Sequence, residues 1–122
     1  MRAVEAIRGF HAHVYFDPDT RANAERLREL LAQRFDVTLG RSHEQPIGPH
    51  TKAMYQVELR PEQLGPLVTW LMLNRDGLSI LVHPMTDDEI ADHLQSAVWL
   101  GEPLPFNLDF VHAYLANRST DY

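Results

Sequence analysis

One stretch decides the fold of this chain: Gly9-Phe10-His11-Ala12-His13-Val14-Tyr15-Phe16-Asp17. Successive side chains of a β-strand point to opposite faces, so its strict period-2 alternation predicts a strand. One face would belong to the core and would carry Phe10, Ala12, Val14 and Phe16. The other face would carry His11, His13 and Tyr15, which are capable of metal or acid–base chemistry. The remaining sequence decides whether further groups join that second face.

Length and composition limit the possibilities. The chain has 122 residues, 44% of them hydrophobic, which predicts one domain spanning residues 1–122. The 17 acidic residues outnumber 11 scattered basic ones, giving a net charge of −6, so we expect no nucleic-acid partner. The chain has no cysteine, which leaves His, Asp and Glu as the strong metal ligands and gives weight to the seven histidines.

No targeting or membrane segment is expected. Residues 1–8 lack the apolar core of a signal peptide. No later run approaches the roughly 20 apolar residues that a membrane-spanning helix needs. We therefore expect a soluble, cytoplasmic protein with no membrane partner.

The elements after the first strand follow from helical spacing and renewed alternation. Asp17-Pro18 predicts the start of a helix that runs to about Arg34. A short strand is expected at residues 37–39, a long polar loop at 40–52 and a third strand at 53–59. A second helix opens at Arg60-Pro61-Glu62-Gln63 and ends at Asp76-Gly77; because of Pro66, residues 61–65 are expected to form an irregular lead-in. Residues 78–84 predict a fourth strand.

This order predicts an α+β fold of the ferredoxin-like βαββαβ class. Its antiparallel four-stranded sheet would carry both helices on one face, with the first strand between the third and the fourth. The core would span residues 9–84, and residues 85–122 would form a helical extension with helices at 87–100 and 107–117. The extension would cover part of the open face or form a dimer contact.

Three histidines are expected to converge on the open face. His11 and His13, two positions apart on a strand, make half of a metal site. In the antiparallel sheet, His83 at the end of the fourth strand would lie close to His11. Ser79, Leu81 and His83 share a face, whereas Ile80 and Val82 suit the core. The alternative for these histidines is an ordinary solvated strand face.

Other polar residues flank this face, and each has a plainer alternative. The loop that carries His50 can fold over the sheet edge, or His50 is a surface histidine. His93 lies beside an apolar helical stripe, so it faces the site or is a packing histidine. Glu58 shares the open face and would complete a two-histidine, one-carboxylate iron site, or it is a solvated strand residue. His43 and His112 are expected to be ordinary surface or helix residues.

The sequence resembles a known family, the small DOPA 4,5-dioxygenase-like proteins of fungi and bacteria. The motifs that carry the resemblance are Phe10-His11-Ala12-His13-Val14-Tyr15-Phe16, Gly48-Pro49-His50, Trp70-Leu71-Met72-Leu73-Asn74-Arg75, Leu81-Val82-His83-Pro84, and Asp92-His93 followed by Trp99-Leu100-Gly101. The resemblance implies extradiol-type ring cleavage of a catechol with non-haem Fe(II) and O2. DOPA is the substrate of the fungal members.

Carried onto this chain, the resemblance implies a division of roles. His11, His13 and His83 would hold the iron, while His50 and His93 would stand nearer the substrate as acid–base groups. Tyr15 would donate a hydrogen bond to the substrate or to a reaction intermediate. A carboxylate on the substrate side chain would meet one of three cations, Arg41, Lys52 or Arg75.

The expected partners are a small aromatic diol and a second copy of the chain. A homodimer is expected because an open sheet face, Trp70 and Trp99 leave apolar surface to cover. Two other functions stay open. One is a non-catalytic metal- or small-molecule-binding ferredoxin-like dimer module, and the other is a cofactor-independent oxygenase.

Overall fold

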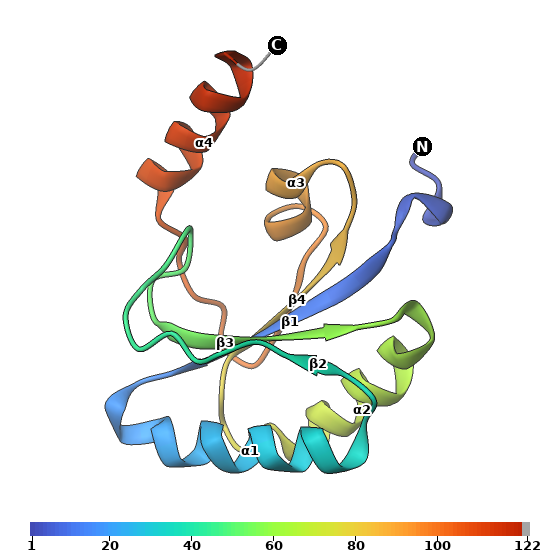
Figure 1. Ribbon diagram of the computed structural model, residues 1–122, viewed down its shortest axis with the longest axis vertical. Coiled ribbons are helices and arrows are strands. Elements are labelled where there is room, and N and C mark those ends of the chain that lie inside the picture. Colours follow the sequence, from blue (N-terminus) through green and yellow to red (C-terminus); the bar gives the residue numbers. More distant parts are fainter. Residues whose placement is uncertain (121–122) are drawn as a thin grey trace.

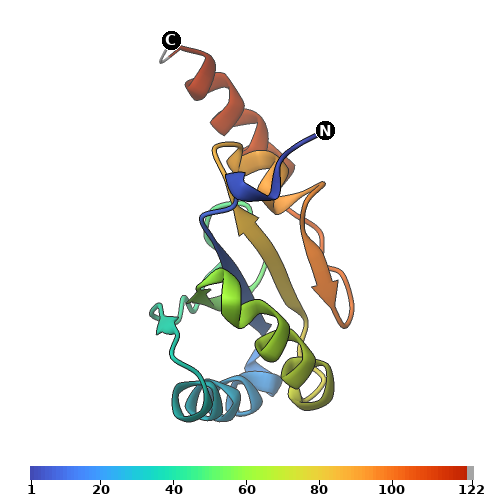
Figure 2. The ribbon, with the colours of Figure 1, turned by 90° about the vertical axis from the view of Figure 1, so that its right-hand side faces the viewer.

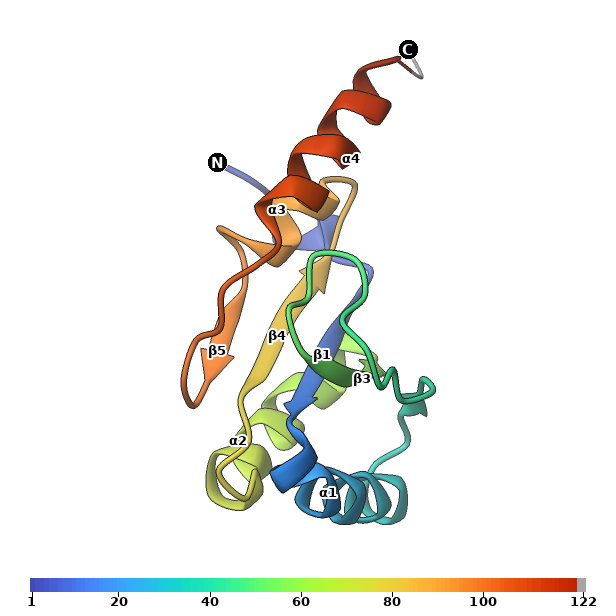
Figure 3. The ribbon, with the colours of Figure 1, turned by 90° about the vertical axis from the view of Figure 1, so that its left-hand side faces the viewer.

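A five-stranded antiparallel sheet forms the centre of the protein in a computed structural model that describes residues 1–120. The strand order is β2-β3-β1-β4-β5, and Figure 3 shows β3, β1, β4 and β5 in this sequence. The strands are Gly9–Phe16 (β1), Thr38–Leu39 (β2), Ala53–Leu59 (β3), Ile80–Met85 (β4) and Val98–Leu100 (β5). As predicted, β1 lies between β3 and β4 and pairs with both.

The helices lie on both sides of this sheet. The two long helices α1 (Arg21–Arg34) and α2 (Leu64–Asn74) cover the lower face in Figure 1, whereas α3 (Glu89–His93) and α4 (Leu108–Thr120) lie above it. In Figures 1 and 2 α4 projects away from the body. Three short 3-10 helices complete the structure: Val4–Ala6 (η1), Pro18–Thr20 (η2) and Pro61–Gln63 (η3). Within residues 1–120, no helix combines the length and the apolar character that crossing a membrane requires.

The main core fills the space between the sheet and the two long helices. It is built from strand residues of alternating position and from one stripe of each helix, including Ala12, Val14, Tyr55, Val57, Ile80, Val82, Leu27, Leu31, Leu67 and Leu71. Burial of each leucine-sized side chain contributes about 1.5–3 kcal/mol. The alternation therefore fixes the register of β1, since a slip by one residue would turn its histidines into the core.

The predicted limits of the first two helices are largely confirmed, and local backbone features explain them. The Asp17 backbone N–H donates to Thr20 Oγ1 at 2.8 Å, which shapes the turn before α1. Pro66 is the third residue of α2, where no intrahelical N–H bond is lost, so the helix begins at Leu64, earlier than predicted. The helix ends where Asp76 and Gly77 adopt φ angles of 57° and 77°.

The helix predicted for residues 87–100 is wrong. Only Glu89–His93 is helical, and the segment then turns at Leu94 and returns as β5. In β5, Val98 pairs with Val82 and Trp99 pairs with Leu81. The apolar spacing that predicted a long helix also suits a short helix followed by a strand. Pairing of β5 with β4 provides hydrogen-bond partners for the backbone groups along the edge of β4, which a longer helix would leave unpaired.

This strand also corrects the predicted sheet and extension. The sheet has five strands where four were predicted, and the segment after residue 84 contributes a strand in addition to helices. The last helix begins at Leu108, one residue after its predicted start, with Asn107 Oδ1 accepting from the Phe110 N–H at 3.2 Å. It continues past the predicted end at residue 117. Residues 121–122 of the predicted extension lie outside the described residues.

Two glycines provide a matched test of this fold. Gly101 ends β5 with φ of 80°, and a Cβ there would lie 3.2 Å from the Leu78 carbonyl oxygen and 2.5 Å from Arg75 Nη1. We expect Gly101→Ala to lower the free energy of unfolding by about 1–3 kcal/mol. Gly65 lies in α2, where an added Cβ would have no atom within 4 Å, so Gly65→Ala should be neutral or stabilising by up to about 1 kcal/mol. Urea denaturation of both variants checks this, and equal stability of the two would contradict it.

Candidate metal centre

Five histidines gather on the face of the sheet opposite α1 and α2. His11 and His13 come from β1, and His83 comes from β4, directly opposite His11 in the strand register. His50 precedes β3 and forms an isolated bridge with Phe106. His93 is the last residue of α3. Four separate segments thus bring imidazoles to one place, as the sequence predicts for His11, His13 and His83 and leaves open for His50 and His93.

His13 lies at the centre of this histidine cluster. Its Nε2 is 3.0 Å from His83 Nε2. Its ring centroid lies 4.4 Å from that of His50 and 5.8 Å from that of His93. Two sets of three histidines each offer nitrogens within 4.8 Å of one another: His11, His13 and His83, and His13, His50 and His93. Because His13 belongs to both sets, it is the histidine on which either arrangement depends.

The backbone fixes the proton position on two of these rings. His83 Nδ1 lies 2.8 Å from the Pro84 carbonyl oxygen, and His93 Nδ1 lies 2.8 Å from the Glu89 carbonyl oxygen. A carbonyl only accepts, so both Nδ1 atoms donate, and each neutral ring keeps the lone pair of Nε2. This outer contact is the usual support of a metal-binding imidazole.

Tyr15 orients His50 through a contact at the same ring nitrogen, Nδ1. The Tyr15 hydroxyl lies 2.7 Å from His50 Nδ1 and is buried, and it is not among the residues that line the open cleft in front of the histidines. Burial raises the pKa of Tyr15, so the phenol stays protonated at neutral pH. The structure thus places Tyr15 behind His50, and its direct contact is with His50 rather than with the cleft.

The buried histidines are held neutral. His13, His50 and His83 are at most 5% exposed. Burial, with repulsion from the neighbouring imidazoles, lowers the pKa of His50 to about 4 and that of His83 to about 3. The same causes hold the pKa of His13 well below its usual range. A neutral imidazole is the form that binds a metal or accepts a proton.

The residues fit a metal ion. Two nitrogens bound at about 2.1 Å and at a right angle lie about 3.0 Å apart, which is the separation of the facing nitrogens of His13 and His83. His13 Nδ1 is buried with no hydrogen-bond partner within residues 1–120. An unpaired buried polar atom costs about 1–3 kcal/mol, and such a cost at a cluster of ligands is typical of a functional site.

Glu58 stands at the exposed edge of the cluster. It pairs with His11 across β1 and β3, and its Oε1 lies 3.5 Å from His11 Nε2. Its side chain is half exposed, and it belongs to neither set of three possible ligands. Glu58 therefore meets the cluster only through His11.

The open cleft has a volume of about 360 Å³ and contains residues that the sequence did not single out. His43 lines it, although no role was expected there. The cation in its lining is Arg8, not one of the three predicted cations. Lys52 pairs with Asp17 at 3.1 Å, and Arg75 donates to the Leu78 carbonyl.

Asp92 is the other residue whose role is not evident from the sequence. It is 2% exposed, and it accepts from the backbone N–H of Thr86 at 2.7 Å and from its hydroxyl at 2.6 Å. These bonds tie α3 to the end of β4 and so set the position of His93. The sequence does not reveal this role, because the partners of Asp92 lie in a neighbouring turn and its only visible feature is its position next to His93. His112, by contrast, is exposed on α4, as expected.

Similarity to known proteins covers most of the chain. A model of the Dopa 4,5-dioxygenase family matches residues 10–110. The chain belongs to this family. The matched range contains all five clustered histidines, Tyr15 and Asp92.

Individual proteins that are similar to this chain agree with the family assignment. A crystal structure from Nostoc punctiforme, assigned provisionally as a dioxygenase, is 51% identical, with a TM-score of 0.90 over 93% of this chain and 99% of that one. An uncharacterized 21.2 kDa protein of Botryotinia fuckeliana is 42% identical over 86% of this chain. The DOPA 4,5-dioxygenase of Amanita muscaria is 35% identical over 84% of this chain. The chain spans 64% and 49% of the lengths of these two fungal relatives.

The neutral histidines predict how stability depends on pH. Above about pH 6.5, His13, His50 and His83 are neutral in both the folded and the unfolded chain. Below about pH 6.5, these three histidines bind protons in the unfolded chain. In the folded chain they stay neutral until the pH reaches their lowered pKa values. The free energy of unfolding of metal-free protein should therefore fall between pH 6.5 and 5, by up to about 1.4 kcal/mol per pH unit for each histidine.

Urea denaturation at pH 7.5, 6 and 5 measures this dependence. His50→Gln should make it shallower, whereas the matched change His112→Gln at an exposed position should leave it unchanged. A stability that is flat over this range in the unmodified chain would show that the histidines are not held neutral by the fold.

Proposed function

We propose that this protein is a non-haem Fe(II) dioxygenase that cleaves the ring of a catechol in the extradiol manner, with both atoms of O2 entering the product. The observation that carries the proposal is the convergence of five histidines around His13 in an open cleft. Family membership supports the reaction class. We also class the domain as ferredoxin-like, because β2-β3-β1-β4 with α1 and α2 on one face follows the predicted order.

His11, His13 and His83 are the proposed iron ligands. They are neighbours on two paired strands and thus form the more rigid of the two sets. The hydrogen bond from His83 Nδ1 to the Pro84 carbonyl aims its Nε2 at His13. The bound iron supplies the Lewis-acid and electron-transfer chemistry that the reaction of a catechol with O2 requires.

His50 and His93 are the proposed acid–base groups. His93 is partly exposed, lines the cleft and keeps its Nε2 lone pair, so it can take a proton from a catechol hydroxyl and return it later. His50 is neutral at pH 7 and is oriented by Tyr15. We assign Tyr15 a positioning role through His50 in place of the direct substrate contact expected from the resemblance. A cytoplasmic location and a homodimer stay predictions.

Oxygen uptake tests the proposal. Protein reconstituted with Fe(II) under anaerobic conditions should consume one O2 per catechol with at least one member of a catechol panel, and a chelator should abolish uptake. We expect His83→Ala to lower kcat/KM at least about 100-fold, because losing even a group that supports a metal ligand typically costs about 10–100-fold in metal affinity or activity. His112→Ala, an exposed histidine on α4, should retain full activity.

The other functions give different results. Stoichiometric metal binding without uptake on any catechol would favour the non-catalytic binding module. Uptake that survives chelation would favour a cofactor-independent oxygenase.

A further inference from the structure

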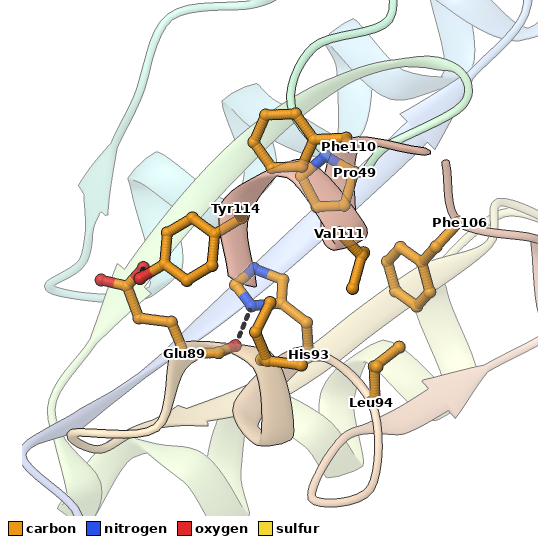
Figure 4. A pocket seen from close by; sticks show the side chains of 9 residues that line it. Pro49, Glu89, His93, Leu94, Phe106, Phe110, Val111 and Tyr114 are labelled. Atoms are coloured by element: carbon orange, nitrogen blue, oxygen red, sulfur yellow. Dashed lines mark hydrogen bonds between the residues drawn. The ribbon is translucent and has the colours of Figure 1, made fainter. Parts of the chain in front are cut away.

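A second pocket lies beside the histidine cluster, between α3 and the first turns of α4 (Figure 4). Its volume is about 180 Å³. Six of its nine lining side chains carry only carbon: Pro49, Ile90, Leu94, Phe106, Phe110 and Val111. Glu89, His93 and Tyr114 are the polar members.

The pocket adjoins the cleft that holds the histidines. Pro49, Glu89 and His93 line both. Figure 4 shows the His93 ring among the pocket side chains, with Nδ1 donating to the Glu89 carbonyl. A ring substrate in contact with His93 therefore has this pocket next to it, within reach of a substituent on the ring.

The polar groups of the pocket are already engaged with each other. The Tyr114 hydroxyl donates to Glu89 Oε2 at 2.8 Å, and the His93 imidazole donates to the backbone of the same residue. No lysine or arginine is among the lining residues, all of which the structure describes. A carboxylate placed here would lose its hydration without gaining a cationic partner.

The size of the pocket limits the group that fits. A cavity of about 150 Å³ accepts a benzene-sized molecule, so this pocket holds up to about six carbon atoms. Resting on the proposed function, we infer that it binds an apolar substituent of the catechol. The preferred substrates are then alkyl- or aryl-substituted catechols, in place of a catechol with a charged amino-acid side chain such as DOPA.

Arg8 offers an alternative way to bind the substrate side chain. It lines the histidine cleft but not the apolar pocket, and it donates to the Thr86 carbonyl at 2.9 Å. A substrate carboxylate bound at Arg8 would give a preference for acidic catechols. The relative kcat/KM values of apolar and acidic catechols distinguish the two arrangements.

The experiment compares kcat/KM for oxygen uptake by the Fe(II)-loaded protein. The substrates are catechol, 4-methyl-, 4-propyl- and 4-butylcatechol, 3,4-dihydroxyphenylacetate and DOPA. The unmodified protein should gain roughly fourfold per methylene up to butyl, which corresponds to about 0.8 kcal/mol per buried CH2. It should prefer butylcatechol to both charged substrates.

Variants locate this preference. Val111→Phe fills the pocket from α4 and should remove the gain with chain length, while activity on unsubstituted catechol stays within about twofold. The matched control Leu108→Phe changes an exposed residue of the same helix, outside the pocket, and should behave as the unmodified protein. Leu94→Phe, at the half-exposed rim, provides a second blocked variant if thermal melting shows that Val111→Phe unfolds.

The outcomes distinguish a failure of the pocket assignment from a failure of the proposed dioxygenase function. Turnover of catechols with no dependence on chain length, or with DOPA or dihydroxyphenylacetate preferred, overturns the pocket assignment and leaves the dioxygenase standing. An equal loss on catechol and butylcatechol in a folded blocked variant also overturns it. No turnover of any catechol by the iron-loaded protein overturns the proposed function and the substrate class with it.

Discussion

Five imidazoles share one face of a sheet, and this crowding is stable only while the rings are uncharged. Burial removes water from His13, His50 and His83, and each ring would repel a charge on the next. The neutral state that results is also the state that binds metal ions and accepts protons. The same physical constraint therefore lowers stability in acid and prepares the site for chemistry.

Burial keeps these rings neutral, and contacts with the surrounding structure orient them. Backbone carbonyls hold the protons of His83 and His93 on Nδ1, and the Tyr15 hydroxyl contacts His50. Asp92 holds α3 against the end of β4 through Thr86. These contacts come from backbone and buried polar groups, so the orientation of the rings does not depend on mobile surface side chains.

The alternation of β1 made much of the site predictable. It assigned His11, His13 and Tyr15 to one face, and the antiparallel register then placed His83 opposite His11. Register alone could not show that His13 comes closer to His83, because that contact depends on ring rotamers. The register places His11 opposite His83, whereas the structure places His13 at the centre of the cluster.

Other features lay beyond sequence reasoning for equally specific reasons. The spacing of Ile90, Leu94 and Ala97 fits a long helix as well as a short one followed by a strand, and only the free edge of β4 decides between them. Arg8 reaches the cleft because β1 begins beside the end of β4, a neighbourhood set by pairing and not by sequence distance. The apolar pocket depends on where α4 begins, which no local pattern specifies.

The central claim is that His13 organises one iron site. Equilibrium dialysis with Fe(II) under anaerobic conditions, on the unmodified chain and on His13→Gln, tests it most directly. One iron per chain, lost in His13→Gln although that variant stays folded, is the predicted result. Stoichiometric binding that survives this substitution, or no binding by the unmodified chain, would contradict it.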